Sequence, residues 1–115
     1  MELKISVYDI LKNSIADDSA DGKKFFSQVI DMYKKEDVCN KIIVDFSNIE
    51  ILNTAFLNDA VGQFFNKNIF NLDNCKVSLV NLKSQAMIDI VEDSVMQAKK
   101  KYAIMVPEET DNSEE

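Results

Sequence analysis

The polar residues best placed for chemistry lie in one stretch, where an apolar run at residues 42–46 leads through a short turn into an amphipathic segment. Asp45 and Ser47 stand at the end of the apolar run, and Asn53 or Thr54 is suited to cap the helix that follows. A hydroxyl at a helix start is a reasonable place for phosphate, because free amides and the dipole favour negative charge. Asp45 could act as a general base, although a carboxylate at a strand end more often accepts hydrogen bonds from loop amides.

Histidine and arginine are both absent from the chain. Without histidine, the chain cannot assemble a Ser-His-Asp or Cys-His nucleophile, a histidine phosphorelay or most transition-metal sites. The two cysteines, Cys39 and Cys75, have no close-spaced partner for zinc. Asp17, Asp18 and Asp21 could offer oxygen ligands to a divalent cation, but their spacing fits no known cation-binding loop. We therefore expect a protein that is not an enzyme and that holds no metal or cofactor.

The charge balance argues against nucleic acid and lipid as partners. The 115-residue chain carries 13 lysines against 20 acidic residues, for a formal charge of −7. Arginine, the usual residue for bidentate contacts to phosphate and guanine, is missing. No apolar run approaches the ~18 residues that span a bilayer, and no secretory signal opens the chain. We expect a cytoplasmic protein with no nucleic-acid or membrane partner, and no motif indicates its oligomeric state.

Apolar patterning predicts one α/β domain over residues 1–106, followed by a disordered acidic tail over residues 107–115. Runs with strand character occupy residues 3–7, 42–46 and 77–80, and an amphipathic segment with helical spacing follows each of them. Strands that alternate with helices predict a largely parallel sheet with right-handed crossovers.

Several local features refine this prediction. Residues 42–46 are almost continuously β-branched or aromatic, which is typical of a strand buried on both faces. Residues 8–12 could continue the first strand or form a helix, and residues 13–21 favour a loop. The helix after this loop is expected to open at Asp21-Gly22. A short apolar run at residues 102–106 could add a fourth, edge strand.

The junction also carries a pattern found in a known family. A hydrophobic strand ends in Asp-hydrophobic-Ser, an asparagine and two apolar residues follow, and a helix then bears Phe-Leu and a later glycine; here these are Asp45-Phe46-Ser47, Asn48, Ile49, Ile51, Phe56-Leu57 and Gly62. This pattern resembles the STAS domain of anti-sigma factor antagonists and sulfate transporters, and is more similar still to small bacterial STAS-like proteins of unassigned function. The resemblance implies a mixed, mostly parallel sheet of about four strands with three helices.

The same resemblance suggests a phosphorylation site. In the antagonists, the helix begins with Asp-Ser-Ser-Gly, and a kinase with the histidine-kinase-like ATPase fold phosphorylates the second serine. The matching residues here are Asn53, Thr54, Ala55 and Phe56. Ala55 has no hydroxyl, so the usual acceptor is absent, and Thr54, one residue earlier, could take its place. The alternative is that Thr54 only caps the helix.

By this resemblance we expect a non-catalytic module in bacterial signalling or regulation, which binds a partner protein through the strand-to-helix junction at residues 47–59. A histidine-kinase-like ATPase is the partner that the resemblance suggests. The residues expected at the contact are Ser47, Asn48, Asn53, Thr54, Phe56, Asn58 and Asp59. Phe56 is expected there as an exposed apolar contact, unless the sheet and the third helix bury it. The alternative function is a small-molecule or nucleotide sensor that uses the same junction.

Overall fold

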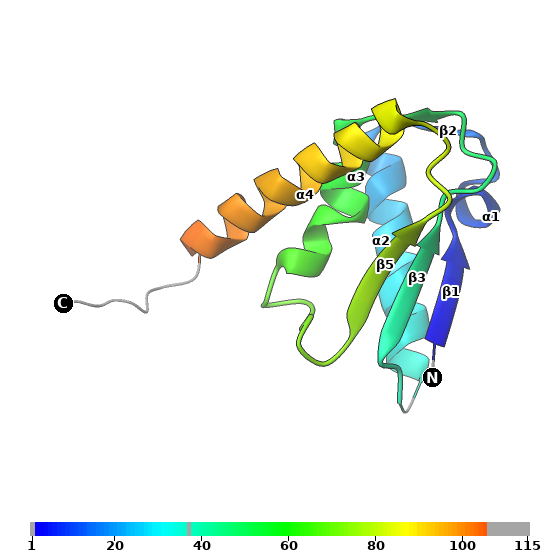
Figure 1. Ribbon diagram of the computed structural model, residues 1–115. Coiled ribbons are helices and arrows are strands. Elements are labelled where there is room, and N and C mark those ends of the chain that lie inside the picture. Colours follow the sequence, from blue (N-terminus) through cyan, green and yellow to red (C-terminus); the bar gives the residue numbers. More distant parts are fainter. Residues whose placement is uncertain (1, 37, 106–115) are drawn as a thin grey trace.

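The computed structural model describes residues 2–36 and 38–105, which form an α/β fold (Figure 1). Three strands form one parallel sheet in the order β1 (Glu2–Ser6), β3 (Lys41–Asp45) and β5 (Lys76–Val80). Two shorter strands, β2 (Ile15–Ala16) and β4 (Ile51–Leu52), pair in parallel as a separate ribbon. The helices are α1 (Val7–Leu11), α2 (Ser19–Lys35), α3 (Thr54–Ala60), the 3-10 helix η1 (Gly62–Phe65) and α4 (Gln85–Met105). The predicted fold class, α/β with mostly parallel strands, is confirmed.

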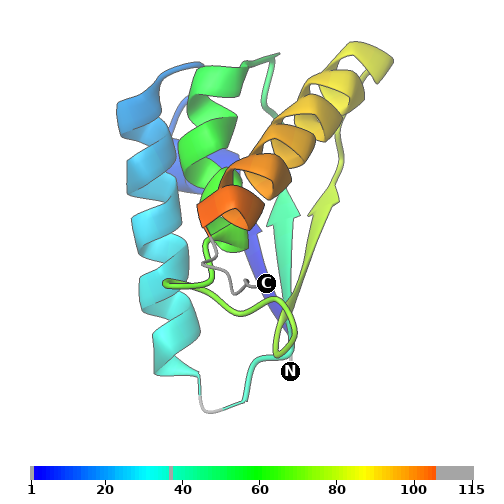
Figure 2. The ribbon, with the colours of Figure 1, turned by 90° about the vertical axis from the view of Figure 1, so that its left-hand side faces the viewer.

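Helices α2, α3 and α4 all lie on one side of the three-stranded sheet (Figures 1 and 2). The two crossovers, from β1 to β3 and from β3 to β5, run in the same direction, and right-handed crossovers of this kind place their helices on the same face. Burial alternates along β3: Ile42 and Val44 are buried, whereas Ile43 and Asp45 are partly exposed. The prediction that this strand is buried on both faces is therefore wrong.

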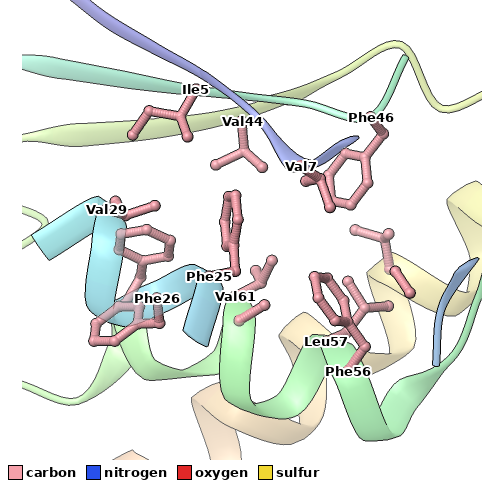
Figure 3. Close-up of a cluster of buried hydrophobic side chains, with 14 of the residues drawn as sticks. Ile5, Val7, Phe25, Phe26, Val29, Val44, Phe46, Phe56, Leu57 and Val61 are labelled. Atoms are coloured by element: carbon pink, nitrogen blue, oxygen red, sulfur yellow. The ribbon is translucent and has the colours of Figure 1, made fainter. Parts of the chain in front are cut away.

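Aromatic side chains fill much of the space between the sheet and the helices (Figure 3). Phe25 of α2 and Phe56 of α3 are fully buried, with ring centroids 6.2 Å apart. Phe26 and Phe64 meet edge to face at 5.1 Å between centroids, a favoured aromatic geometry. At Gly22, α2 and α3 approach so closely that a Cβ built there would lie 2.4 Å from the Phe56 carbonyl oxygen. The packing of α2 on α3 therefore requires glycine at this position.

Capping side chains decide where α1 and α2 begin. The Ser6 hydroxyl oxygen accepts a hydrogen bond from the backbone N–H of Asp9 (3.1 Å) and caps α1. Of the strand and the helix that the sequence allows after β1, the structure therefore has the helix. The Asp18 carboxylate caps α2 in the same way, through the backbone N–H of Asp21 (2.7 Å). α2 therefore starts earlier than the sequence predicts, and the expected loop at residues 13–21 contains β2 and the first turn of α2.

The predicted edge strand at residues 102–106 is wrong, because α4 continues through residue 105. Residue 106 and the predicted acidic tail lie outside the described residues. The buried Tyr102 accepts a hydrogen bond from the Gln63 side-chain amide of η1 through its phenol oxygen (3.0 Å), which fixes the end of α4 against the domain. No helix within residues 2–36 and 38–105 combines the length and the apolar character needed to cross a bilayer.

Candidate functional site

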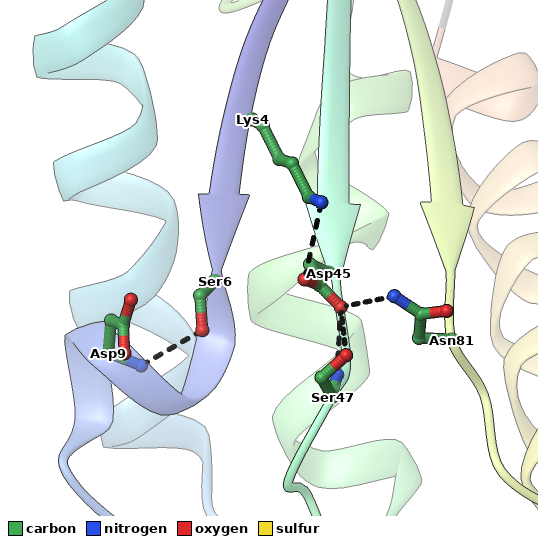
Figure 4. A network of polar contacts seen from close by, with 6 residues as sticks. All are labelled: Lys4, Ser6, Asp9, Asp45, Ser47 and Asn81. Atoms are coloured by element: carbon green, nitrogen blue, oxygen red, sulfur yellow. Dashed lines mark hydrogen bonds and ion pairs between the residues drawn. The ribbon is translucent and has the colours of Figure 1, made fainter.

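Asp45 ends β3 and connects the loops that follow β3 and β5 (Figure 4). Its Oδ1 accepts hydrogen bonds from the Ser47 backbone N–H (2.9 Å), the Ser47 hydroxyl (2.8 Å) and the Asn81 side-chain amide (2.9 Å). The Lys4 ammonium lies 3.9 Å from Oδ2. The carboxylate therefore fixes the path of the chain as it leaves the sheet.

The environment of Asp45 also decides its protonation. Burial alone would raise the pKa of this carboxyl, but the hydrogen bonds from Asn81 and Ser47 and the charge of Lys4 together hold the pKa below its ordinary value. A carboxylate with a lowered pKa and three donors on one oxygen is a poor proton acceptor. Of the two roles that the sequence leaves open for Asp45, the geometry favours binding of loop donors over general-base chemistry.

Ser47 and Asn48 form the turn that opens the junction. Ser47 is half-buried, and its hydroxyl is held by Asp45. Asn48 is exposed and has a φ of 68°, in the left-handed region that asparagine adopts more readily than most residues. An open depression of about 390 Å³ lies at this turn, and Asn81 and Lys83 also line it. The structure thus brings both predicted residues to the carboxyl edge of the sheet.

Asn53, one of the two residues that the sequence offers as a helix cap, caps α3. Its Oδ1 accepts a hydrogen bond from the Phe56 backbone N–H (3.1 Å), and its side-chain amide donates to the Asp17 carbonyl oxygen (2.9 Å). The side chain therefore connects the start of α3 to the segment before α2. Thr54 is exposed and does not supply the cap, so the interpretation of Thr54 as a cap alone is wrong.

The predicted contact residues within α3 differ in exposure. Phe56 is 0% exposed, so its expected place on the surface is wrong; α3 lies so close to α2 that this ring packs between the helices and the sheet. Asp59 is half-buried and accepts a hydrogen bond from the Ser19 hydroxyl of α2. Thr54 and Asn58 are the predicted residues that α3 presents to solvent.

An exposed apolar pair on the β2–β4 ribbon was missed by the sequence reasoning. Ile15 and Ile51 are 36% and 51% exposed, and the parallel register places them directly opposite each other. β4 is followed at once by Asn53, so this ribbon pair lies beside the start of α3. The available signal was Ile15 itself, a lone large apolar residue in a segment rich in aspartate, serine and alanine.

A parallel sheet with helices packed on one face, and a capped strand-to-helix junction at its edge, define an α/β domain of the STAS-like class. The model of one family, the STAS-like domain of unknown function (DUF4325), matches residues 21–87, and the chain belongs to this family. The matched segment runs from the first turn of α2 to the start of α4 and includes the whole junction. No curated protein and no solved structure matches the chain.

Proposed function

We propose that this chain is a non-catalytic interaction module in bacterial signalling or regulation, and that it binds a partner protein through the β2–β4 ribbon and the exposed start of α3. The observation that carries the proposal is the exposed ribbon pair, Ile15 and Ile51, beside the junction. Large apolar side chains that face solvent together are typical of contact surfaces, whereas single exposed ones are common everywhere. The exposed Thr54, three positions after Ile51, provides a polar group at the start of α3, whereas Asn58 lines a depression against α4.

Backbone hydrogen bonds on both sides of the ribbon pair hold it in place. The Glu50 N–H donates to the Ser14 carbonyl oxygen (2.8 Å), and the Asn53 N–H donates to the Ala16 carbonyl oxygen (3.2 Å). Because this segment is ordered before binding, association does not have to order it, and the entropy cost of binding is lower. The ribbon therefore has the preorganisation that supports a specific contact.

The ribbon pair is large enough to affect affinity measurably. Complete burial of one isoleucine side chain contributes about 1.5–3 kcal/mol. Since Ile15 and Ile51 are 36% and 51% exposed, a partner that covers both would gain about 2 kcal/mol. A free energy of this size corresponds to a change of about 30-fold in Kd.

Charge indicates which partner surface would fit. The exposed carboxylates of Asp17 and Asp18 follow β2, and the whole chain carries a formal charge of −7. Such a surface favours a basic partner and gives association that weakens as salt increases. By the likeness to anti-sigma factor antagonists, the proposed partner is an ATPase of the histidine-kinase-like fold.

Ile51→Asp tests the contact, with Ile69→Asp as the matched control. Ile69 is exposed to a similar extent, 48%, but lies between η1 and β5 and outside the ribbon. Tagged wild-type and variant chains would be cross-linked in cells of the source organism, and captured proteins identified by mass spectrometry. Each purified partner would then be titrated by calorimetry. We expect Ile51→Asp to weaken binding at least about sevenfold, from the lost burial of this one side chain, and Ile69→Asp to leave Kd unchanged; equal losses, or no direct partner, would contradict the proposal.

A small-molecule or nucleotide sensor is the second candidate. The open depression of about 390 Å³ favours it, because it lies at the carboxyl edge of the sheet, where ligands of open α/β sheets bind. Lys83 lines this depression and is ion-paired with Glu50. A thermal-shift screen against nucleotides would support this function through a rise in Tm, and a flat result across the panel would count against it.

A further inference from the structure

An apolar groove of about 230 Å³ lies where α4, β5 and η1 meet. Phe65 of η1, Val77 and Leu79 of β5 and Val95 of α4 contribute partly exposed side chains to its walls. Lys99 of α4 also lines the groove and is the charged residue among its lining side chains. This α4–β5 groove shares no residue with the ribbon pair or with the junction, so its function is independent of the proposed partner contact.

The groove exists because α4 packs mainly on α3 and η1 and does not close over β5. The parallel register pairs Ile42 with Val77 and Val44 with Leu79, so all four side chains lie on the helix-covered face of the sheet. Ile42 and Val44 are 0% exposed, whereas Val77 and Leu79 are only partly buried. β5 therefore presents part of the apolar face of the sheet to solvent.

The lining of the groove indicates the chemistry of an occupant. The Lys99 ammonium lies 5.9 Å from the centroid of the Phe65 ring, so a positive charge stands at an otherwise apolar wall. The volume of about 230 Å³ is below the ~300–1,000 Å³ of pockets for drug-sized ligands. We propose that the α4–β5 groove binds a small amphipathic monocarboxylate.

In this arrangement the hydrocarbon chain lies against Val77, Leu79 and Val95, and the carboxylate pairs with the Lys99 ammonium. Lys100 and Lys101 follow on the same helix, but Lys101 lines a separate depression beside Asn58, and Lys99 is the one of the three that lines the groove. Charge complementarity therefore favours a small anion with an apolar body.

Calorimetry and two-dimensional NMR with octanoate, octylamine and 1-octanol test the proposal. We expect saturable, one-to-one binding of octanoate, with chemical-shift changes centred on the groove, and binding of octylamine that is about tenfold weaker. Lys99→Gln should weaken octanoate binding about tenfold and leave 1-octanol binding unchanged. Lys100→Gln, one residue along the helix, is the matched control and should change neither. Val95→Phe should fill the groove and weaken binding of all three ligands, while circular dichroism verifies the fold.

Three results would overturn the proposal. Equal binding of octanoate and octylamine would show that Lys99 does not select an anion. The absence of saturable octanoate binding up to about 10 mM would show that the groove does not bind this ligand class. A dimer in sedimentation experiments that dissociates on Val95→Asp would show that a second copy covers the groove.

Discussion

Gly22→Ala is the substitution that most directly tests how α2 and α3 pack. A Cβ at this position would lie 2.4 Å from the Phe56 carbonyl oxygen, 3.0 Å from the Asp59 Cβ and 3.2 Å from the Ala60 backbone nitrogen. Two of these atoms belong to the backbone of α3 and cannot rotate away as a flexible side chain would. The added methyl group therefore has to push α3 away from α2.

Two opposing effects set the size of the change. Replacing a helical glycine by alanine stabilises a helix by about 1 kcal/mol where the methyl group has room. Overpacking costs about 1–3 kcal/mol, and the upper end applies here because backbone atoms obstruct the methyl group. A shift of α3 also disturbs the contact of Phe25 with Phe56, whose ring centroids lie 6.2 Å apart. We expect a net loss of about 2 kcal/mol in the free energy of unfolding, or about 10 °C in Tm for a domain of this size.

Gly62→Ala is the matched control for this experiment. A Cβ at Gly62 would lie 3.5 Å from the Ala98 Cβ and 3.8 Å from the Leu57 carbonyl oxygen, which are ordinary contact distances. We expect its stability to stay the same or to rise by up to about 1 kcal/mol. Urea unfolding followed by circular dichroism measures all three proteins. If Gly22→Ala is as stable as the wild type, or if Gly62→Ala loses as much, close approach of the helices is not what requires glycine.

Three further predictions concern single side chains. The lowered pKa of Asp45 makes its carboxylate stabilising above the unfolded-state pKa of about 4, and this contribution is lost as pH falls through the lower folded-state pKa. Asp45→Asn should therefore reduce stability at pH 7, with a difference from wild type that closes in acid; a constant difference in urea titrations would contradict this. Burial, with Cys39 nearby, raises the pKa of the Cys75 thiol to about 11, so Ellman's reagent should modify Cys75 only after unfolding, and rapid reaction of a Cys39→Ala variant would refute it. If the exposed Thr54 accepts phosphate in the source organism, phosphate should appear in Thr54→Ser and be absent from Thr54→Val, and unphosphorylated native protein would rule the switch out.

Periodicity predicted the three strands of the main sheet well, because each has an apolar run that is bounded by polar residues. It did not predict the open face, because the consecutive apolar residues Ile42, Ile43 and Val44 give no sign that one face lacks helices. The β2–β4 ribbon was missed because strands of two residues have no period to detect. The end of α4 was misread because Tyr102 is held by Gln63, which is 39 positions away in the sequence.

The exposed residues of the candidate site could not be chosen from the sequence alone. Phe56 and Ile51 are both large apolar residues near the start of α3, and only the packing of α2 decides that Phe56 is buried while Ile51 is exposed. That packing depends on Gly22, which lies 34 positions before Phe56 along the chain. Asn53 was recognised as one of two candidate caps, because capping depends on neighbouring residues.

The strands of the main sheet occur in space in the same order as in the chain. Open α/β sheets usually bind small molecules at a topological switch point, where the strand order reverses and the loops on either side separate into a crevice. The order β1-β3-β5 contains no such reversal, so the described sheet does not divide its loops in this way. Recognition on this scaffold therefore has to rely on loops and edges, which can vary without any change to the strands themselves.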